Sequence, residues 1–190
     1  MVGVDPEPGR NAGVLVTVAS TQVGAVLAAV ATGGARWQDR AMVRATIDDG
    51  TVLDALNDLY LGHASHQSAR YVLALADGRT ERQSSSGLIV ATGTGATGWA
   101  SSIAHDRGGA PLPGPESADL AWFVREAWPS PTSGTGLTMG ALQPGETLEV
   151  LVQSDSLVVF GDGLEADRLT ATWGQTVRLA VSERRLRLVR

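Results

Sequence analysis

Apolar and polar residues alternate with a period of two over much of the chain, the pattern of strands that bury one face. From residue 40 onward such segments, or short apolar runs, follow one another with turn residues between them. They occupy residues 40–47, 52–63, 68–76, 79–83, 87–91, 119–127, 136–143, 147–153, 156–163, 164–169, 176–182 and 184–190. Roughly ten short strands and one or two helices predict a mainly β fold. We expect a β-sandwich or layered antiparallel sheets in a single domain over residues 1–190.

Two local signals add detail to this pattern. Four apolar residues before Gly33-Gly34 recur at the spacing of one helix face: Val23, Val26, Leu27 and Val30. Ser20 can cap the start of this helix, and the two glycines can end it. Asp77-Gly78 lies between two strand-like segments and predicts a hairpin with a type I′ turn, in which both residues have positive φ.

Composition indicates a folded protein, because 43% of the 190 residues are hydrophobic and 18% are charged. No apolar run approaches the roughly 20 residues that a membrane-spanning helix needs. The first ten residues, MVGVDPEPGR, lack the apolar core of a signal peptide. We therefore expect a cytoplasmic protein without a membrane partner.

The absence of two residue types excludes several chemistries. The chain has no cysteine, which excludes disulfides, thiolate nucleophiles and cysteine-ligated zinc. All 15 cationic residues are arginines, so a Walker A loop and Schiff-base chemistry are excluded as well. The net charge of −5 argues against a nucleic-acid partner. His63 and His66 lack a third ligand at a known spacing, and we expect no metal site.

Glycines recur through GTGATG, residues 93–98, and fit the G-x-G-x-x-G pattern of dinucleotide-binding loops. That pattern belongs at the first turn of a βαβ unit, with an acidic residue about 20 residues later at the end of the next strand. Here Glu116 and Asp119 precede the next strand, and the segments on both sides suggest antiparallel pairing. We therefore disfavour the βαβ interpretation. A glycine-rich turn that lets backbone segments cross is one alternative.

The other alternative is a resemblance that covers nearly all of the chain in order. SGLIVATGTGATGWASSI, residues 86–103, resembles the NAD kinase segment D-G-x-I-V-S-T-P-T-G-S-T-A-Y-S without a gap. ALNDLYL, residues 55–61, resembles the family's A-L-N-E/D strand. RWQDRAMVRATI places Arg40 at the arginine of an R-x-x-L strand, and residues 160–163 resemble a short V-D-G element.

The resemblance implies a fold like the C-terminal domain of NAD kinases, a β-rich domain that supplies most of the dinucleotide site. These enzymes phosphorylate the 2′-hydroxyl of NAD with ATP or polyphosphate and Mg²⁺, and they usually form homodimers or tetramers. A separate N-terminal α/β domain carries the G-G-D-G motif whose aspartate activates the hydroxyl. The substrate- or nucleotide-binding positions that the resemblance implies here are Asn57, Asp58, Thr92, Thr94, Gly95, Thr97, Gly98 and Trp99.

The residue types suit that role. Asn57 and Asp58 can bond ribose hydroxyls or an adenine amino group, and the threonines offer hydroxyls. Glycines let the backbone approach a ligand closely, and Trp99 can stack on a base. Other roles stay open, because Asn57 and Asp58 can be outward-facing strand residues and Trp99 can be a core aromatic.

The chain also departs from the family. It contains no G-G-D-G, so we expect no catalytic residue in it and no activity without an N-terminal domain. Its start in a strand-like segment at Val2 suggests a piece of a longer protein. Ser86 replaces an aspartate, Gly93 a proline, Gly98 an alanine and Trp99 a tyrosine. A non-catalytic nucleotide-binding or oligomerisation module therefore remains an alternative, as does a related kinase with a lipid or sugar acceptor.

Overall fold

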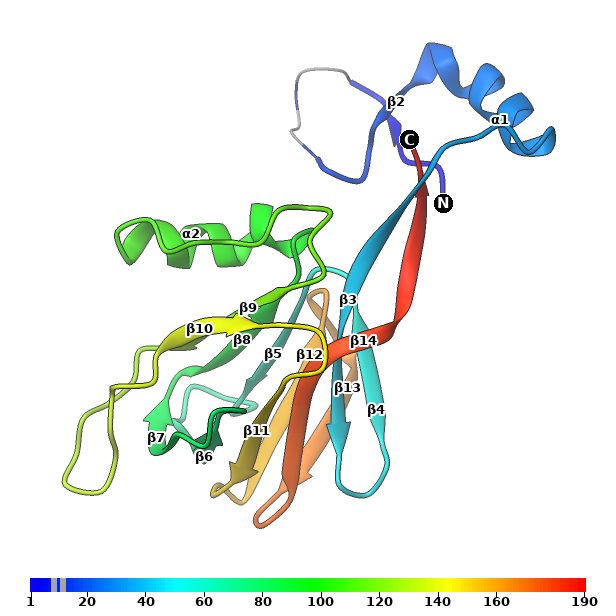
Figure 1. Ribbon diagram of the computed structural model, residues 1–190. Coiled ribbons are helices and arrows are strands. Elements are labelled where there is room, and N and C mark those ends of the chain that lie inside the picture. The colour runs from blue at the N-terminus through cyan, green and yellow to red at the C-terminus, as the bar shows by residue number, and fades with distance from the viewer. Residues whose placement is uncertain (8–9, 11–12) are drawn as a thin grey trace.

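The computed structural model describes residues 1–7, 10 and 13–190. Two six-stranded sheets pack face to face (Figure 1), and every strand pair within them is antiparallel. The mainly β fold with layered antiparallel sheets is therefore confirmed. We call the two layers sheet I and sheet II.

Sheet I consists, in spatial order, of β10 (Met139–Leu142), β9 (Leu120–Arg125), β8 (Gly87–Ala91), β5 (Asp58–Gly62), β12 (Ser156–Gly161) and β13 (Leu164–Thr172). Sheet II consists of β4 (Val52–Ala55), β3 (Trp37–Ile47), β14 (Thr176–Val189), β11 (Thr147–Val152), β6 (Ala69–Ala74) and β7 (Thr80–Ser85). The remaining strands, β1 (Val4–Asp5) and β2 (Val18–Ala19), form a small parallel pair.

The main core lies between the two sheets and follows the period-two pattern of the sequence. In β6 the alternate residues Ala69, Tyr71 and Leu73 are buried, and Leu148 and Val150 of β11 join them. Sheet I contributes Leu59, Leu61, Leu88 and Leu157 to the same cluster. Burying each such side chain stabilises the fold by about 1.5–3 kcal/mol, so alternation decides which face of each strand points inward.

The predicted segment 52–63 is not one strand, and this is a correction. It divides into β4, which belongs to sheet II, and β5, which belongs to sheet I. Leu56 and Asn57 form the crossing between the layers. Both halves are rich in apolar residues, so the sequence pattern does not show where the chain leaves one sheet for the other.

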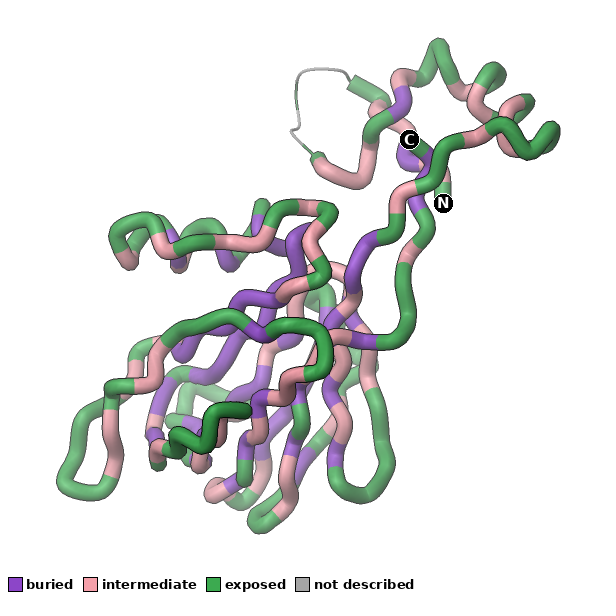
Figure 2. The backbone as a smooth tube through the Cα atoms, viewed as in Figure 1, coloured by how far each residue is buried: buried purple, intermediate pink, exposed green. Residues whose placement is uncertain are grey.

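The predicted first helix is present as α1 (Val23–Ala31), and Gly33 at φ +74° follows its end as expected. The start differs, because Ser20 makes no side-chain cap and instead opens a 3₁₀ turn, η1 (Ser20–Gln22). No residue of α1 is buried. The helix lies beside both termini, where β3 and β14 extend beyond the sandwich as a ribbon (Figures 1 and 2).

A second helix, α2 (Trp99–Asp106), follows the short 3₁₀ turn η2 (Gly95–Thr97). Its Ala100 and Ala104 pack with Ala91, Ala121 and Phe123 on the outer face of sheet I. The 107–117 segment that follows contains no helix or strand, as expected for a loop. None of the helices that the structure describes is long and apolar enough to cross a membrane.

The predicted hairpin joins β6 and β7, but its turn is not of type I′. Only Gly78 has positive φ, +86°, while Asp77 does not. The Gly78 amide donates to Leu75 O at 3.0 Å, and the Leu75 amide donates to Arg79 O at 2.9 Å. The loop therefore holds three residues with a left-handed glycine in the last position, the next commonest hairpin type.

Candidate functional site

The crossing between β4 and β5 leaves two backbone amides without a ladder partner, and one side chain satisfies both. Asp162 accepts the Leu56 amide at 2.9 Å and the Asn57 amide at 2.6 Å. Its own amide donates to Asp58 O at 3.0 Å, and it holds a left-handed backbone with φ +54°. Asp162 therefore fixes the position of Asn57 and Asp58.

Thr92 holds the same crossing from the other side. It is fully buried, and its hydroxyl donates to Leu56 O at 2.6 Å. The Thr92 hydroxyl oxygen also accepts hydrogen bonds from the amides of Thr94 at 3.1 Å and Gly95 at 3.2 Å. The Thr92 amide also donates to Asn57 O at 2.9 Å. These bonds join the crossing to the turn that follows β8.

An open cavity of about 390 Å³ lies where the crossing, the turn after β8 and the turn after β12 meet. Seven of the eight residues predicted from the sequence line it, together with two residues of the β12–β13 turn. The lining consists of Asn57, Asp58, Thr94, Gly95, Thr97, Gly98, Trp99, Asp162 and Gly163. Thr92 lies behind the cavity wall and does not line it.

Asp58 carries the most perturbed carboxyl of this site. Burial raises its pKa from 3.8 to about 6, and the nearby Asp162 carboxylate adds to the shift. A raised pKa means that the charged form of this carboxyl is destabilised in the folded protein. Hydrogen bonds donated by ligand hydroxyls would stabilise that charged form. The arrangement suits a ligand that donates hydrogen bonds.

Thr94 presents a second unsatisfied group. The residue is 3% exposed, and its hydroxyl oxygen has no hydrogen-bond partner among the residues that the structure describes. Buried polar groups are nearly always paired, so an unpaired hydroxyl on a residue of a cavity wall is a candidate for bonding a ligand. Thr97 is exposed in the next turn and donates its hydroxyl to Thr94 O at 3.2 Å.

Trp99 is neither a core residue nor a freely exposed one. Trp99 is 38% exposed, and its ring stacks on that of Tyr60 with centroids 5.9 Å apart. The Arg125 guanidinium lies over the ring, 5.0 Å from its centre. Tyr60 in turn donates its hydroxyl to Ser86 O at 2.8 Å. The indole is thus fixed in place at the edge of the cavity.

The glycines of residues 93–98 have different causes. A Cβ on Gly93 would lie 1.8 Å from Gly114 O, and one on Gly95 would lie 2.0 Å from Asn57 O. Both glycines are needed because backbone segments cross there, as one of the sequence alternatives proposed. A Cβ on Gly98 would meet nothing closer than 3.5 Å, so this position has room for a side chain.

The βαβ interpretation of this stretch is excluded by topology. The turn joins β8 to α2, and the next strand, β9, is the antiparallel neighbour of β8. A dinucleotide-binding loop of the Rossmann kind requires a parallel pair. Of the three glycines at that spacing, Gly93 and Gly95 are there for the steric reasons given above.

Asp162 and Gly163 are the lining residues absent from the sequence-based set. The signal for Asp162 is its place in the V-D-G-like element, but its partners lie 105 and 106 residues earlier in the chain. Residues 1–7, 10 and 13–190 contain no group of three or more His, Asp or Glu side chains able to hold a metal.

No protein-family model matches the chain. An NAD kinase of Caldicellulosiruptor saccharolyticus is 27% identical over 153 residues, which cover 80% of this chain and 54% of that kinase. The crystal structure of yeast NADH kinase complexed with NADH matches with a TM-score of 0.74 and 16% identity. That match covers 93% of this chain and 51% of the yeast chain. The chain thus spans about half the length of these proteins, and the resemblance to the NAD kinase family is confirmed.

Proposed function

We propose that the chain is the β-rich, dinucleotide-binding domain of an NAD kinase-like phosphotransferase, and that residues 1–190 form this one domain. The complete enzyme would transfer a phosphoryl group from ATP or polyphosphate to the 2′-hydroxyl of NAD or a related nucleotide. The similarity to an NAD kinase over 80% of the chain supports this proposal.

One observation carries the assignment of the binding site. The unpartnered Thr94 hydroxyl and the Asp58 carboxyl, whose pKa is raised to about 6, line the same cavity. One side chain needs a hydrogen-bond partner, and the other can accept bonds from a ribose diol or an adenine amino group. A nucleoside supplies both kinds of group at once. Asn57 and Thr97 add further polar atoms to the same wall.

The reaction itself requires groups from outside this chain. The 190 residues contain no G-G-D-G, so the aspartate that activates the hydroxyl in the family would come from an N-terminal domain. The described residues contain no metal cluster, and we give them no part in holding the Mg²⁺ that phosphoryl transfer uses. We therefore expect binding without turnover from this domain alone.

Two further expectations belong to the same proposal. The family's tendency to form dimers or tetramers suggests a homo-oligomer for the complete protein, and the composition suggests a cytoplasmic location. The missing G-G-D-G also favours a second candidate, a non-catalytic nucleotide-binding module.

Calorimetry with NAD, NADP and ATP tests the proposal on the chain as it is. We expect NAD or NADP to bind the wild type. Asp58→Ala should bind them at least roughly tenfold more weakly, because it loses a charge-assisted hydrogen bond, and Thr94→Val should bind them up to roughly tenfold more weakly, because it loses a neutral one. Asp167→Asn is the matched control, because Asp167 is exposed on β13 away from the cavity lining. Failure of every nucleotide to bind would refute the proposal.

Turnover separates the two candidates once binding is established. A kinase assay on the longer protein that encodes G-G-D-G should convert NAD to NADP. If no such protein is encoded with this chain, the non-catalytic module is the correct function.

A further inference from the structure

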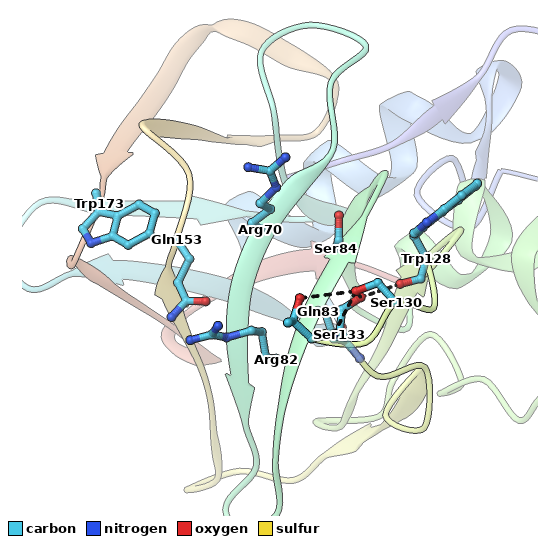
Figure 3. A pocket seen from close by; sticks show the side chains of 10 residues that line it. Arg70, Arg82, Gln83, Ser84, Trp128, Ser130, Ser133, Gln153 and Trp173 are labelled. Carbon is cyan, nitrogen blue, oxygen red and sulfur yellow. Dashed lines mark hydrogen bonds between the residues drawn. The ribbon is translucent and has the colours of Figure 1, made fainter.

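A second cavity, of about 450 Å³, opens on the outer face of sheet II (Figure 3). Its floor is the β6–β7 hairpin, from which Arg70, Arg82 and Ser84 project. One wall is the loop after β9, and the other comprises Gln153 and Trp173 from the turns that follow β11 and β13. None of these residues lines the candidate nucleotide site on the other side of the fold.

The floor carries two positive charges on one face of the sheet. Arg70 lies opposite Ser84 in the β6–β7 ladder, and Arg82 lies two residues before Ser84. Tyr71 follows Arg70 and Gln83 follows Arg82, and both side chains are buried on the inner face of the sheet. Arg70 and Arg82 therefore project from its outer face. Diagonal neighbours of this kind are about 7–8 Å apart, close enough to share one phosphate chain. Neither arginine takes part in an ion pair within the described residues.

Two tryptophans stand at opposite sides of the cavity, with the arginines between them (Figure 3). Trp128 is 68% exposed and Trp173 is 66% exposed, whereas most tryptophans are largely buried. Each ring presents a broad apolar face to solvent. A nucleotide base can stack on such an exposed aromatic face.

Backbone hydrogen bonds fix the wall that carries Trp128. The Trp128 amide donates to Ser84 O at 2.7 Å, and the Gly134 amide donates to Arg82 O at 2.9 Å. Between these points, Ser133 donates its hydroxyl to Trp128 O at 2.7 Å. The loop thus continues the sheet along the free edge of β7, while the indole ring remains exposed.

The opposite wall is held in the same way. The Gln153 amide donates to Arg70 O at 2.8 Å, and the Gly174 amide, next to Trp173, donates to Val152 O at 3.0 Å. Because the backbone is fixed, only the side-chain torsions of the two tryptophans remain to be ordered when a ligand binds, which limits the entropic cost. The cavity is therefore built on ordered structure on both sides.

We propose that this cavity is a second binding site, for a nucleotide, and we call it the sheet II site. The phosphates of the nucleotide lie against Arg70 and Arg82, and its base stacks on Trp128 or Trp173. Gln153 and Ser133 supply neutral hydrogen-bonding groups at the rim. Arginine side chains recognise phosphate with two parallel N–H donors, and the opposing aromatic rings add selectivity for a base over inorganic phosphate. The net charge of −5 makes this local concentration of positive charge stand out.

Titration with ATP, tripolyphosphate and adenosine tests the sheet II site. All of these titrations use the Asp58→Asn variant as the starting protein, so that the candidate nucleotide site contributes less to the signal. We expect ATP to bind at least roughly tenfold more tightly than either fragment, because charge and stacking act together. The double variant Arg70→Gln/Arg82→Gln should weaken ATP binding roughly tenfold or more. Arg79→Gln, in the same hairpin but paired with Asp77 at 2.8 Å, should not.

The tryptophan variants separate a nucleotide site from other uses of the same surface. Trp128→Leu/Trp173→Leu should weaken ATP binding and leave tripolyphosphate binding unchanged, and Trp37→Leu should affect neither. The proposal is wrong if ATP affinity survives the arginine double variant, or if tripolyphosphate binds as tightly as ATP. It is equally wrong if the tryptophan variant only converts an oligomer to a monomer, since the surface would then join copies of this chain. NAD titration of the arginine double variant with Asp58 restored separates the two proposals: loss of ATP binding at the sheet II site with NAD binding intact leaves the proposed function untouched.

Discussion

Asp58→Asn should stabilise the folded protein above about pH 6 while it weakens nucleotide binding. The wild-type carboxyl is partly buried beside Asp162, and both effects raise its pKa to about 6. Near neutral pH the folded protein therefore holds a carboxylate in a place that disfavours its charge. Asparagine has nearly the same shape and no charge, so it removes this penalty without leaving a cavity.

The magnitude follows from the pKa. A shift from 3.8 to about 6 corresponds to an upper limit of roughly 3 kcal/mol, at about 1.4 kcal/mol for each pKa unit. The side chain is partly open to water, which screens the interaction, and we therefore expect about 1–2 kcal/mol. For a chain of this length that gain raises the melting temperature by about 2–8 °C.

The sign of the pH dependence is fixed by the direction of the shift. Between about pH 3.8 and pH 6 the folded state binds a proton at Asp58 that the unfolded state has released. Wild-type stability from this group is therefore fully present below pH 3.8 and is lost as the pH rises through about 6. Above that range Asp58→Asn has its full advantage.

Denaturant unfolding from about pH 4 to about pH 8 measures this difference directly. The free energy of unfolding of Asp58→Asn minus that of the wild type should increase as the pH rises. Asp167→Asn, which changes an exposed carboxylate on β13, should show no such trend. A constant difference over the whole range, or a less stable Asp58→Asn at pH 8, would refute the reasoning.

Further predictions concern the same cavity and use the same unfolding and calorimetric measurements. Gly95→Ala should destabilise the protein by more than about 3 kcal/mol, because the Cβ would lie 2.0 Å from Asn57 O, whereas Gly98→Ala should cost less, because its Cβ would meet nothing closer than 3.5 Å. Asp162→Ala removes the acceptor of two crossing amides and should cost about 2–4 kcal/mol, with partial recovery in Asp162→Asn. Thr94→Val should leave stability unchanged or slightly raised, because its buried hydroxyl has no partner among the described residues, and should reduce nucleotide affinity. Equal losses of stability and affinity in Thr94→Val would contradict a ligand-binding role.

Local patterns in the sequence are sufficient to predict most of the strands. Period-two alternation is set by burial of one strand face, and it locates β3, β6 and β11 within a few residues. Gly78 marks the β6–β7 hairpin, because a left-handed residue is needed there. The first helix ends at its glycines for the same reason. These features depend on residues that are close together in the chain.

The crossing at Leu56 and Asn57 could not be predicted in this way. Its two amides are satisfied by a carboxylate more than 100 residues away, so no local signal distinguishes this break from continuous strand. The failure of α1 to bury its apolar residues has a similar cause, since its surroundings depend on the path of β3 and β14. Long-range topology, rather than residue preference, decides both.

Seven of the eight residues that the resemblance to NAD kinases implied line one cavity. The resemblance did not distinguish residues that can contact a ligand from residues that hold the backbone in place. Thr92 and Gly95 are needed for the crossing itself, because one bonds it and the other lets the backbone pass. Gly93 departs from the family proline where Gly114 approaches, so steric need accounts for it without any change of ligand. Ser86 and Trp99 differ in kind, because both contact Tyr60 and Trp99 also lines the cavity. We therefore expect the departures that bear on the identity of the ligand to lie at this aromatic edge and at Gly98, which lines the cavity without a steric need, whereas Gly93 and Gly95 mark where the backbone crosses.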